Sequence, residues 1–297
     1  MRRIRFDLCG AAVAAALILA GSAAGIAADA PAAAAAPGAN ASKEAPPRKE
    51  ETPADRIEKQ LKAIQDRLQD VISDEIKLAM ELTAAQGRAN ALKGYARKAA
   101  LFQIAERVRA FEGNYANLVK ALAPLEKERG QATPDQQKRI DDLSKQIYTK
   151  HMKETEKIAA MYEQVGETKA IYDLWADYYQ SLPETKRDRG LKEKVAQQAE
   201  KCGDFRGAIR WWRSIFEAAP AKDRYRDRGV GEKIGDLMVK SGDMTGALSV
   251  YKNLLEAIPA EKRDGDGKSL KDKIIAIEVK LGRVAPPPPP PKTPPKK

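Results

Sequence analysis

The sequence contains very few of the side chains on which disulfides, metal sites and histidine-based catalysis depend. Its 297 residues include two cysteines and one histidine. Cys9 lies in a segment that we expect to be removed on export, which leaves Cys202 without a disulfide partner, as a half-buried filler. A multi-histidine metal site and a histidine-based triad are excluded, and His151 is expected on the surface of a charged helix.

Phosphate loops, calcium loops and alternating strand patterns are missing as well. Residues 267–269 (Gly-Lys-Ser) lack the upstream glycine of a phosphate loop, and residues 264–267 (Asp-Gly-Asp-Gly) precede a lysine where a calcium loop needs an oxygen ligand. Carboxylate pairs are frequent, as on any charged helical surface, so they do not indicate acid–base catalysis. We therefore expect no enzymatic activity, no cofactor and no metal.

The two ends of the chain differ in composition from the rest. Residues 1–28 combine a basic start, an Ala/Leu/Ile stretch and small residues near the end, which is typical of a signal peptide; an uncleaved membrane anchor is the alternative. Residues 29–51 are predicted to be an Ala/Pro-rich disordered linker, and residues 285–297 a disordered tail of proline and lysine. The protein is therefore expected to be periplasmic or secreted, in the cell envelope.

The formal net charge is +11, which limits the partners that need to be considered. A basic chain can bind nucleic acid, but an exported one is expected to meet anionic wall polymers or membrane head groups instead, so nucleic acid is not expected. The basic tail is the segment predicted to make such a contact. The simpler interpretation is that the excess charge only keeps the protein soluble.

Residues 52–155 are predicted to form long, coiled-coil-like helices. Thr52-Pro53 and Thr133-Pro134 are helix starts, because threonine caps a helix and proline fits its first turn. Apolar residues recur at spacings of three and four along 57–82 and again along 101–125. The first stripe fits either a homo-oligomer through residues 57–82 or a helical hairpin within one chain.

A short pattern recurs four times between residues 156 and 284. In each copy an acid, a lysine and an isoleucine or valine stand ten, nine and eight positions before a glycine. The glycines are Gly166, Gly203, Gly242 and Gly282, so the copies are 37, 39 and 40 residues apart. A period of this size predicts a repeat array, in which each small unit buries its apolar face against its neighbours.

In three copies the glycine is followed by a second helix with shared features. The marked positions are Ala170, Ala208 and Ala247, the aromatic residues Trp212 and Tyr251, and the prolines Pro183, Pro220 and Pro259. The glycine is expected to turn the chain, the alanine to let two helices approach, the aromatic residue to fill the gap between units, and the proline to stop the helix. The fourth copy has Ile275 where the others have a small residue, and it is predicted to be a terminal cap.

These residues resemble the tetratricopeptide repeat family over about positions 156–283, although the family unit has about 34 residues. The resemblance implies a partner-binding groove lined by the first helix of each unit. The matching positions are Glu156, Glu193, Gln197, Glu232, Asp236 and Asp272. They predict an acidic groove for a basic or amide-rich peptide, unless they are ordinary solvated charges.

The sequence as a whole predicts an all-α protein with long helices followed by a short α-solenoid of roughly 3.5 units. Its layout is similar to that of periplasmic coiled-coil-plus-tetratricopeptide proteins. We expect an exported adaptor that binds protein or peptide partners. The alternative is a structural spacer or a wall-binding protein that uses its basic tail. The charged loops at 184–189, 221–228 and 260–267 are either solvated connections or an edge for an anionic ligand.

Overall fold

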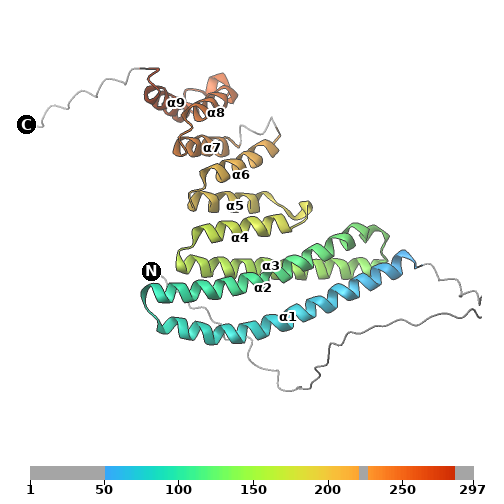
Figure 1. Cartoon of the computed structure of the whole chain (residues 1–297). Helices are drawn as coiled ribbons and strands as arrows, with labels where there is room; N and C mark the ends of the chain where they lie inside the picture. The colour runs from blue at the N-terminus through green and yellow to red at the C-terminus, as the bar shows by residue number, and fades with distance from the viewer. Residues whose placement is uncertain (1–50, 221–226, 285–297) are drawn as a thin grey trace, which may run out of the picture. The chain divides into compact units, whose positions relative to one another are not determined.

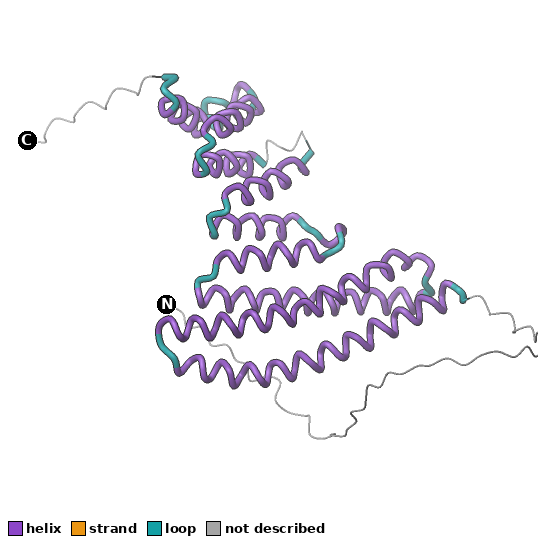
Figure 2. Tube along the Cα trace, viewed as in Figure 1, coloured by secondary structure: helices purple, strands orange, loops and turns teal. Residues whose placement is uncertain are grey.

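The computed structural model describes residues 51–220 and 227–284, and no strand occurs among them. Three long helices come first: α1 (Pro53–Ala91), α2 (Gly94–Glu128) and α3 (Pro134–Val165). Six shorter ones follow: α4 (Thr168–Ser181), α5 (Arg189–Lys201), α6 (Phe205–Ala218), α7 (Arg228–Lys240), α8 (Met244–Ala257) and α9 (Lys268–Lys280). The connections contain the 3-10 turns η1 (Arg129–Gln131), η2 (Glu184–Lys186) and η4 (Ala260–Lys262). Figures 1 and 2 show the short helices stacked beyond α3 in chain order.

Three predicted segments fall wholly or mostly outside the described residues. They are the signal peptide (1–28), the linker except for its last residue (29–50) and the tail (285–297). Among the helices that the structure does describe, none combines the length and the apolar character needed to cross a membrane.

The predicted starts of the long helices are confirmed in detail. Thr52 and Thr133 both form capping boxes, with Asp55 and Gln136 respectively, and a proline follows each threonine at the first helical position. Helix α1 passes through the glycine at 87 and ends at Ala91, after which the chain reverses direction before α2. These caps satisfy backbone N–H groups that a helix start would otherwise leave unpaired.

The heptad stripe of α1 is buried within this chain, as the hairpin alternative predicts. Its fully or almost fully buried members are Ile57, Leu61, Ile64 and Leu68. They share one apolar cluster with residues of α2 and α3, including Leu118, Leu122, Ile140 and Ile147. A homo-oligomer through residues 57–82 would therefore need another face of α1, on which Ile76 and Met80 are exposed.

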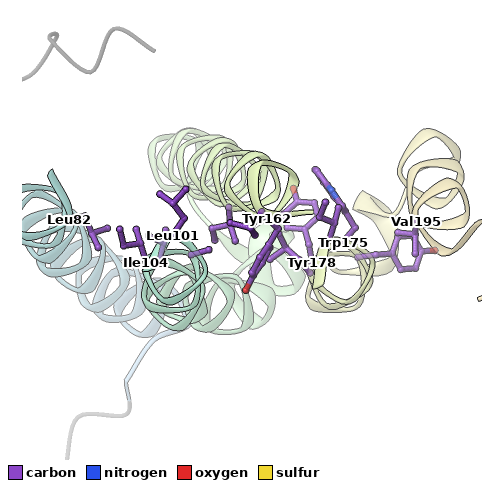
Figure 3. Close-up of a cluster of buried hydrophobic side chains, with 14 of the residues drawn as sticks. Leu82, Leu101, Ile104, Tyr162, Trp175, Tyr178 and Val195 are labelled. Atoms are coloured by element: carbon purple, nitrogen blue, oxygen red, sulfur yellow. The ribbon is translucent and has the colours of Figure 1, made fainter. Parts of the chain in front are cut away.

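Helix α3 connects the long helices to the repeat array without a break. It crosses the predicted boundary at residue 155, so its last turns are also the first helix of the first repeat unit. Figure 3 shows the buried cluster at this junction, with Leu82, Leu101, Ile104, Tyr162, Trp175, Tyr178 and Val195 labelled. Because these residues come from α1 through α5, the long helices and the first unit share one core.

The turn residues of the repeats behave as predicted. Gly166, Gly203, Gly242 and Gly282 have φ angles of +82°, +81°, +88° and +70°, in the left-handed region that favours glycine. Helices α4, α6 and α8 each end two residues before a proline, namely Pro183, Pro220 and Pro259. The residue preceding each proline is extended, as the proline ring requires.

The small and aromatic positions explain how the units pack. Ala208 and Ala247 have no exposed surface, and Tyr251 lies so close to Gly235 that a Cβ there would be 2.3 Å from the ring. Trp212 and Tyr251 are buried as predicted. These contacts allow the two helices of a unit to approach closely.

The first unit differs from the others by one position. Its residue nine places after the glycine is Trp175, which is buried like Trp212 and Tyr251 and is their structural counterpart. Ala170 stands one place too early to match Ala208 and is only partly buried; Ile171 occupies the matching place. The alignment that starts from the glycine, rather than from the alanine, is therefore the one that the structure supports.

Candidate functional site

The candidate site is the surface formed by the first helices of successive units, α3, α5, α7 and α9, which we call the first-helix face. At each junction between units, a lysine of one first helix lies over an aromatic ring from the second helix of the preceding unit. The pairs, with the distance from Nζ to the ring centroid, are Lys194–Trp175 (3.5 Å), Lys233–Trp212 (4.2 Å) and Lys273–Tyr251 (5.3 Å). The electron-rich face of an aromatic ring attracts a cation at such distances.

The same lysines also contact carboxylates on the preceding first helix. The shortest of these ion pairs are Lys194–Glu156 (3.7 Å), Lys233–Glu200 (3.1 Å) and Lys273–Asp236 (2.8 Å). In two junctions the ring donates to the same acid: Trp212 Nε1 to Glu200, and the Tyr251 hydroxyl to Asp236. A lysine–aromatic–carboxylate contact thus joins each pair of successive units.

Burial has opposite effects on the two titratable partners in these contacts. It lowers the pKa of Lys194, although the nearby Glu156 carboxylate acts in the other direction. Burial, together with the hydrogen bond to Asp236, raises the pKa of Tyr251 far above its ordinary value. Both effects follow from the low polarity of the junction, which disfavours the charged form of each group.

Two further acids of the predicted groove, Glu193 and Glu232, are paired as well. Arg189 Nε lies 2.8 Å from Glu193 on its own helix, and the same guanidinium reaches Asp227 at 2.9 Å. Glu232 is 3.1 Å from Arg228 and is also approached by the lysine of α9. The predicted acids therefore lie on the first-helix face, but most are neutralised by cations of the same array.

Only two of the predicted groove positions lack such partners. Gln197 and Asp272 are exposed, and neither has a side-chain hydrogen bond or ion pair among the described residues. The prediction of an acidic groove thus missed the lysine row. A signal for it was present, because a lysine directly follows the acid in every copy of the pattern.

A pocket of about 360 Å³ opens on this face between α3, α4 and α5. The Trp175 ring and the small side chains of Ala159 and Ala160 line it, together with Glu163 and Lys201. Glu163 and Lys201 are exposed, and neither forms an ion pair within the described parts of the chain. The pocket therefore offers one free acid and one free base beside an aromatic wall.

In two of the three charged loops an arginine binds the protein's own backbone, whereas residues 221–226 of the third loop lie outside the described residues. Arg187 donates from Nε to the Leu182 carbonyl and from Nη2 to the Gln180 carbonyl, both at 2.8 Å. Arg263 makes the same two contacts at the end of α8, with the carbonyls of Ile258 (2.9 Å) and Glu256 (3.0 Å). These guanidinium groups satisfy carbonyls that a helix end leaves unpaired, which gives Arg187 and Arg263 a structural role.

The prediction that His151 lies on the surface is wrong. Its side chain has no exposed area, and Nε2 lies 2.5 Å from Glu112 Oε1, which also accepts a hydrogen bond from Thr155. Its ring meets the Tyr178 ring edge-on, with 4.6 Å between centroids. His151 is buried because it occupies the face of α3 that packs against α2 and α4.

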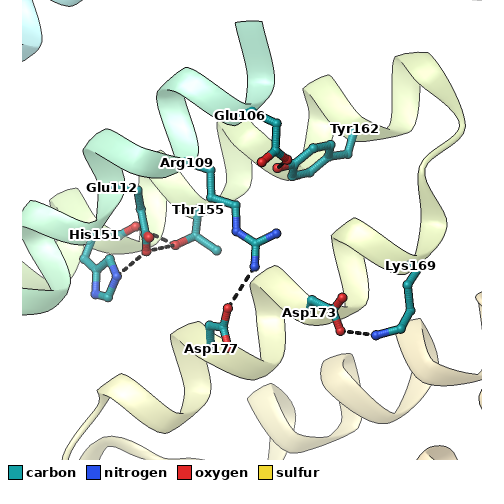
Figure 4. A network of polar contacts seen from close by, with 9 residues as sticks. All are labelled: Glu106, Arg109, Glu112, His151, Thr155, Tyr162, Lys169, Asp173 and Asp177. Carbon is teal, nitrogen blue, oxygen red and sulfur yellow. Dashed lines mark hydrogen bonds and ion pairs between the residues drawn. The ribbon is translucent and has the colours of Figure 1, made fainter. Parts of the chain in front are cut away.

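Figure 4 shows this polar network at the junction of α2, α3 and α4. Arg109 of α2 reaches Asp177 of α4 at 2.9 Å, and the Tyr162 hydroxyl donates to Glu106. Burial, strengthened by that carboxylate, raises the pKa of Tyr162 to about 12. The network fastens the first repeat unit to the long helices.

The sequence also led to expectations about the Cys202 thiol and about metal-binding side chains. Cys202 is partly buried, as predicted, and its thiol lies 3.3 Å from the Ala199 carbonyl. Within the described residues, no group of three or more His, Cys, Asp or Glu side chains is arranged to hold a metal ion.

Comparisons with known proteins do not assign the chain to a family, so its class rests on the arrangement of its helices. No family model matches the chain, and no curated protein does. Similar solved structures include the de novo designed helical repeat protein DHR64 and the DHF119 filament. Each has 14% identity, covers 77% of this chain and 93% of its own, and has a TM-score of 0.20. Scores this low add nothing to the argument. The stacked helices of the described residues themselves define an all-helical repeat protein.

Proposed function

We propose that the protein is an exported, non-enzymatic scaffold of the cell envelope, whose tetratricopeptide-like repeats bind protein or peptide partners on the first-helix face. The observation that carries this proposal is the pocket beside Trp175, with its free Glu163 and Lys201. The acids that the repeat pattern marks are mostly paired within the array, so the free groups are the ones a partner would bind. Repeat arrays use such extended surfaces for recognition.

The size and chemistry of the pocket indicate what part of a partner it accepts. A volume of about 360 Å³ accommodates one or two side chains of an extended peptide. Glu163 would bind a basic side chain, while Lys201 and the half-buried amide of Gln198 would bind backbone carbonyls or side-chain amides. We therefore propose a peptide that carries at least one basic residue, which keeps the basic or amide-rich partner predicted from the sequence.

The second candidate is a structural spacer or wall-binding protein. The observation that favours it is the composition of residues 285–297, in which prolines and lysines predominate. Lysines on an extended proline-rich segment suit the contact of an anionic polymer or membrane surface. In that case the repeats would serve as a rigid support.

Site-specific photo-crosslinking in the native host tests the two candidates against each other. A benzophenone amino acid replaces Ala160 in the pocket, and in a matched control it replaces Asn114, which is exposed on α2. We expect a discrete protein adduct from position 160 that disappears when Glu163→Lys is added and persists when residues 285–297 are deleted. No adduct from position 160, or equal adducts from both positions, contradicts the proposal. Loss of attachment on tail deletion alone favours the second candidate.

A further inference from the structure

The last helix of the array, α9, has a face that nothing in the described chain covers. Every earlier first helix packs against the second helix of its own unit, as Gly235 packs against Tyr251. No second helix follows α9 among the described residues, and Ile275, which stands at the position of Gly235, is 46% exposed. Terminal units of repeat arrays normally present a polar outer face, and Ile275 departs from that rule at the place where a second helix would pack.

The uncovered face has a definite composition. Ile275 stands where the second helix of the unit packs in α7. The other residues of the face lie beside it, at spacings of three and four along α9 and just beyond it: Asp272, Ala276, Val279, Lys280 and Arg283. Ala276 is exposed and Val279 is half-buried, whereas Ile274 and Ile277 face the core. The face therefore combines a small apolar centre with an acid toward one end and cations toward the other.

The charges on this face are unpaired, in contrast to those beside it. Lys273, Lys271 and Glu278 of the same helix all form ion pairs, at 2.8 Å with Asp236, 2.7 Å with Asp264 and 2.8 Å with Lys252. Asp272 and Lys280 form none within the described residues. Asp272 lies one turn before Ala276 and Lys280 one turn after it. These two free charges would complement a surface that presents a cation opposite Asp272 and an acid opposite Lys280.

We propose that this surface is the same face of a second copy of the chain, so that α9 pairs with α9 in an antiparallel, two-fold symmetric contact. With the symmetry axis at Ala276, the residue four positions before it faces the residue four positions after it in the other copy. Asp272 of each copy then meets Lys280 of the other, and Ile275 and Val279 pack across the axis. The small Ala276 lets the two helices approach closely.

The other arrangements suit the face less well. A parallel pair would place Asp272 opposite Asp272 and Lys280 opposite Lys280, which is repulsive. The residues after Val284 are predicted to be the proline-rich tail, so they are not expected to supply a second helix. The contact is distinct from the homo-oligomer predicted through residues 57–82, and it does not depend on the partner-binding proposal.

Charge exchange tests the contact, because an antiparallel pair predicts which combinations are complementary. The mass of the full-length chain is measured by sedimentation equilibrium from about 1 µM to about 1 mM, the range in which small interfaces associate. We expect a monomer–dimer equilibrium. Asp272→Lys and Lys280→Asp, alone, should each raise the dissociation constant by about tenfold or more, because each turns two attractive pairs into two repulsive ones.

Two combinations of these substitutions should restore dimerisation. The double variant Asp272→Lys/Lys280→Asp reverses both ends and should dimerise within about threefold of the original constant. An equimolar mixture of the two single variants should form a heterodimer, since one copy then carries only cations and the other only acids on this face. Met80→Lys, on an exposed part of α1, is the matched control and should have no effect. Circular dichroism verifies that each variant is folded.

Three results would overturn the proposal. The first is a chain that stays monomeric throughout the concentration range, as it would if another protein covered α9. The second is a dimer that both single α9 variants leave intact, or that Met80→Lys abolishes. The third is a folded double variant that fails to recover dimerisation.

Discussion

Replacement of His151 tests the structure most directly, because the sequence pattern and the structure predict opposite results. His151→Ala removes a hydrogen bond to the Glu112 carboxylate, worth about 1.5–3 kcal/mol. It also leaves a cavity where the imidazole packed edge-on against Tyr178, at a further cost of about 1–2 kcal/mol. We therefore expect the free energy of unfolding to fall by about 2.5–5 kcal/mol. A surface histidine could be replaced without measurable effect.

Two further variants separate the hydrogen bond from the packing. His151→Phe refills most of the volume but cannot donate to Glu112, so we expect it to lose about 2 kcal/mol. Adding Glu112→Leu removes the carboxylate left without a partner and should recover part of that loss. The double-mutant cycle of positions 151 and 112 should give a coupling energy of about 1–3 kcal/mol, because the two side chains are in contact.

Urea unfolding followed by circular dichroism measures all of these variants. The control is Lys153→Ala, an exposed position on the same helix, for which we expect a change within about 0.5 kcal/mol. If His151→Ala unfolds like that control, α3 is rotated relative to the arrangement described and the ring faces solvent. If the losses at positions 151 and 112 simply add, the two side chains do not interact.

Three further predictions follow from individual contacts. Trp212→Ala should lower the free energy of unfolding by about 3–5 kcal/mol in the same urea assay, because the ring is 4% exposed, and Trp211→Ala, at a partly exposed position, should lower it less. Arg263→Lys should cost about 1–2 kcal/mol in thermal unfolding, because an ammonium group cannot replace the two-pronged contact with the end of α8; an unchanged melting temperature would contradict this. Burial raises the pKa of Glu154 above its ordinary value of 4.5, so the folded protein binds this proton more tightly than the unfolded chain, and the stability contributed by Glu154 falls as the pH rises above 4.5. Glu154→Gln should therefore be more stable than the original at neutral pH, with a difference that shrinks below pH 4.5; equal stability across that range would refute the sign.

Local sequence signals predicted the parts of the fold that depend on a few neighbouring residues. The threonine–proline starts of α1 and α3 and the glycine turns of the repeats follow from backbone geometry, which one or two residues determine. The burial of Trp212 and Tyr251 followed from their equivalent places in the repeats. The choice between a hairpin and an oligomer could not be made, because the stripe of α1 is the same in both cases.

The errors came from judging residues by their neighbours in sequence. His151 stands among charged residues, but it also lies four positions after Ile147 and seven before Ile158, on the buried face of α3. That spacing was a sufficient signal for burial. The pairing of the groove acids was harder to predict, because each lysine contacts an acid more than thirty residues earlier in the chain, and only the stacked helices bring the two together.

The acids of the first-helix face therefore fall into two groups, which should respond differently to neutralisation. Glu232 is half-buried, and it contacts Arg228 on its own helix and Lys273 across a unit junction. Glu163 is exposed, has no ion pair within the described residues, and lines the pocket beside Trp175. The first acid is placed to hold units together, and the second to bind a partner.

Two variants and two assays distinguish these roles. Glu232→Gln should lower the free energy of unfolding by about 0.5–1 kcal/mol and leave the affinity for a lysine-containing peptide unchanged. Glu163→Gln should leave stability unchanged and weaken that peptide about two- to fivefold at low salt, with no effect on a glutamate-rich control peptide. Fluorescence anisotropy measures the affinities, and urea unfolding measures the stabilities. The reverse pattern, in which Glu232→Gln weakens peptide binding and Glu163→Gln does not, would mean that partners compete with Lys273 for the carboxylates that it contacts. Binding would then loosen the junctions between units, and the array would act as more than a rigid support.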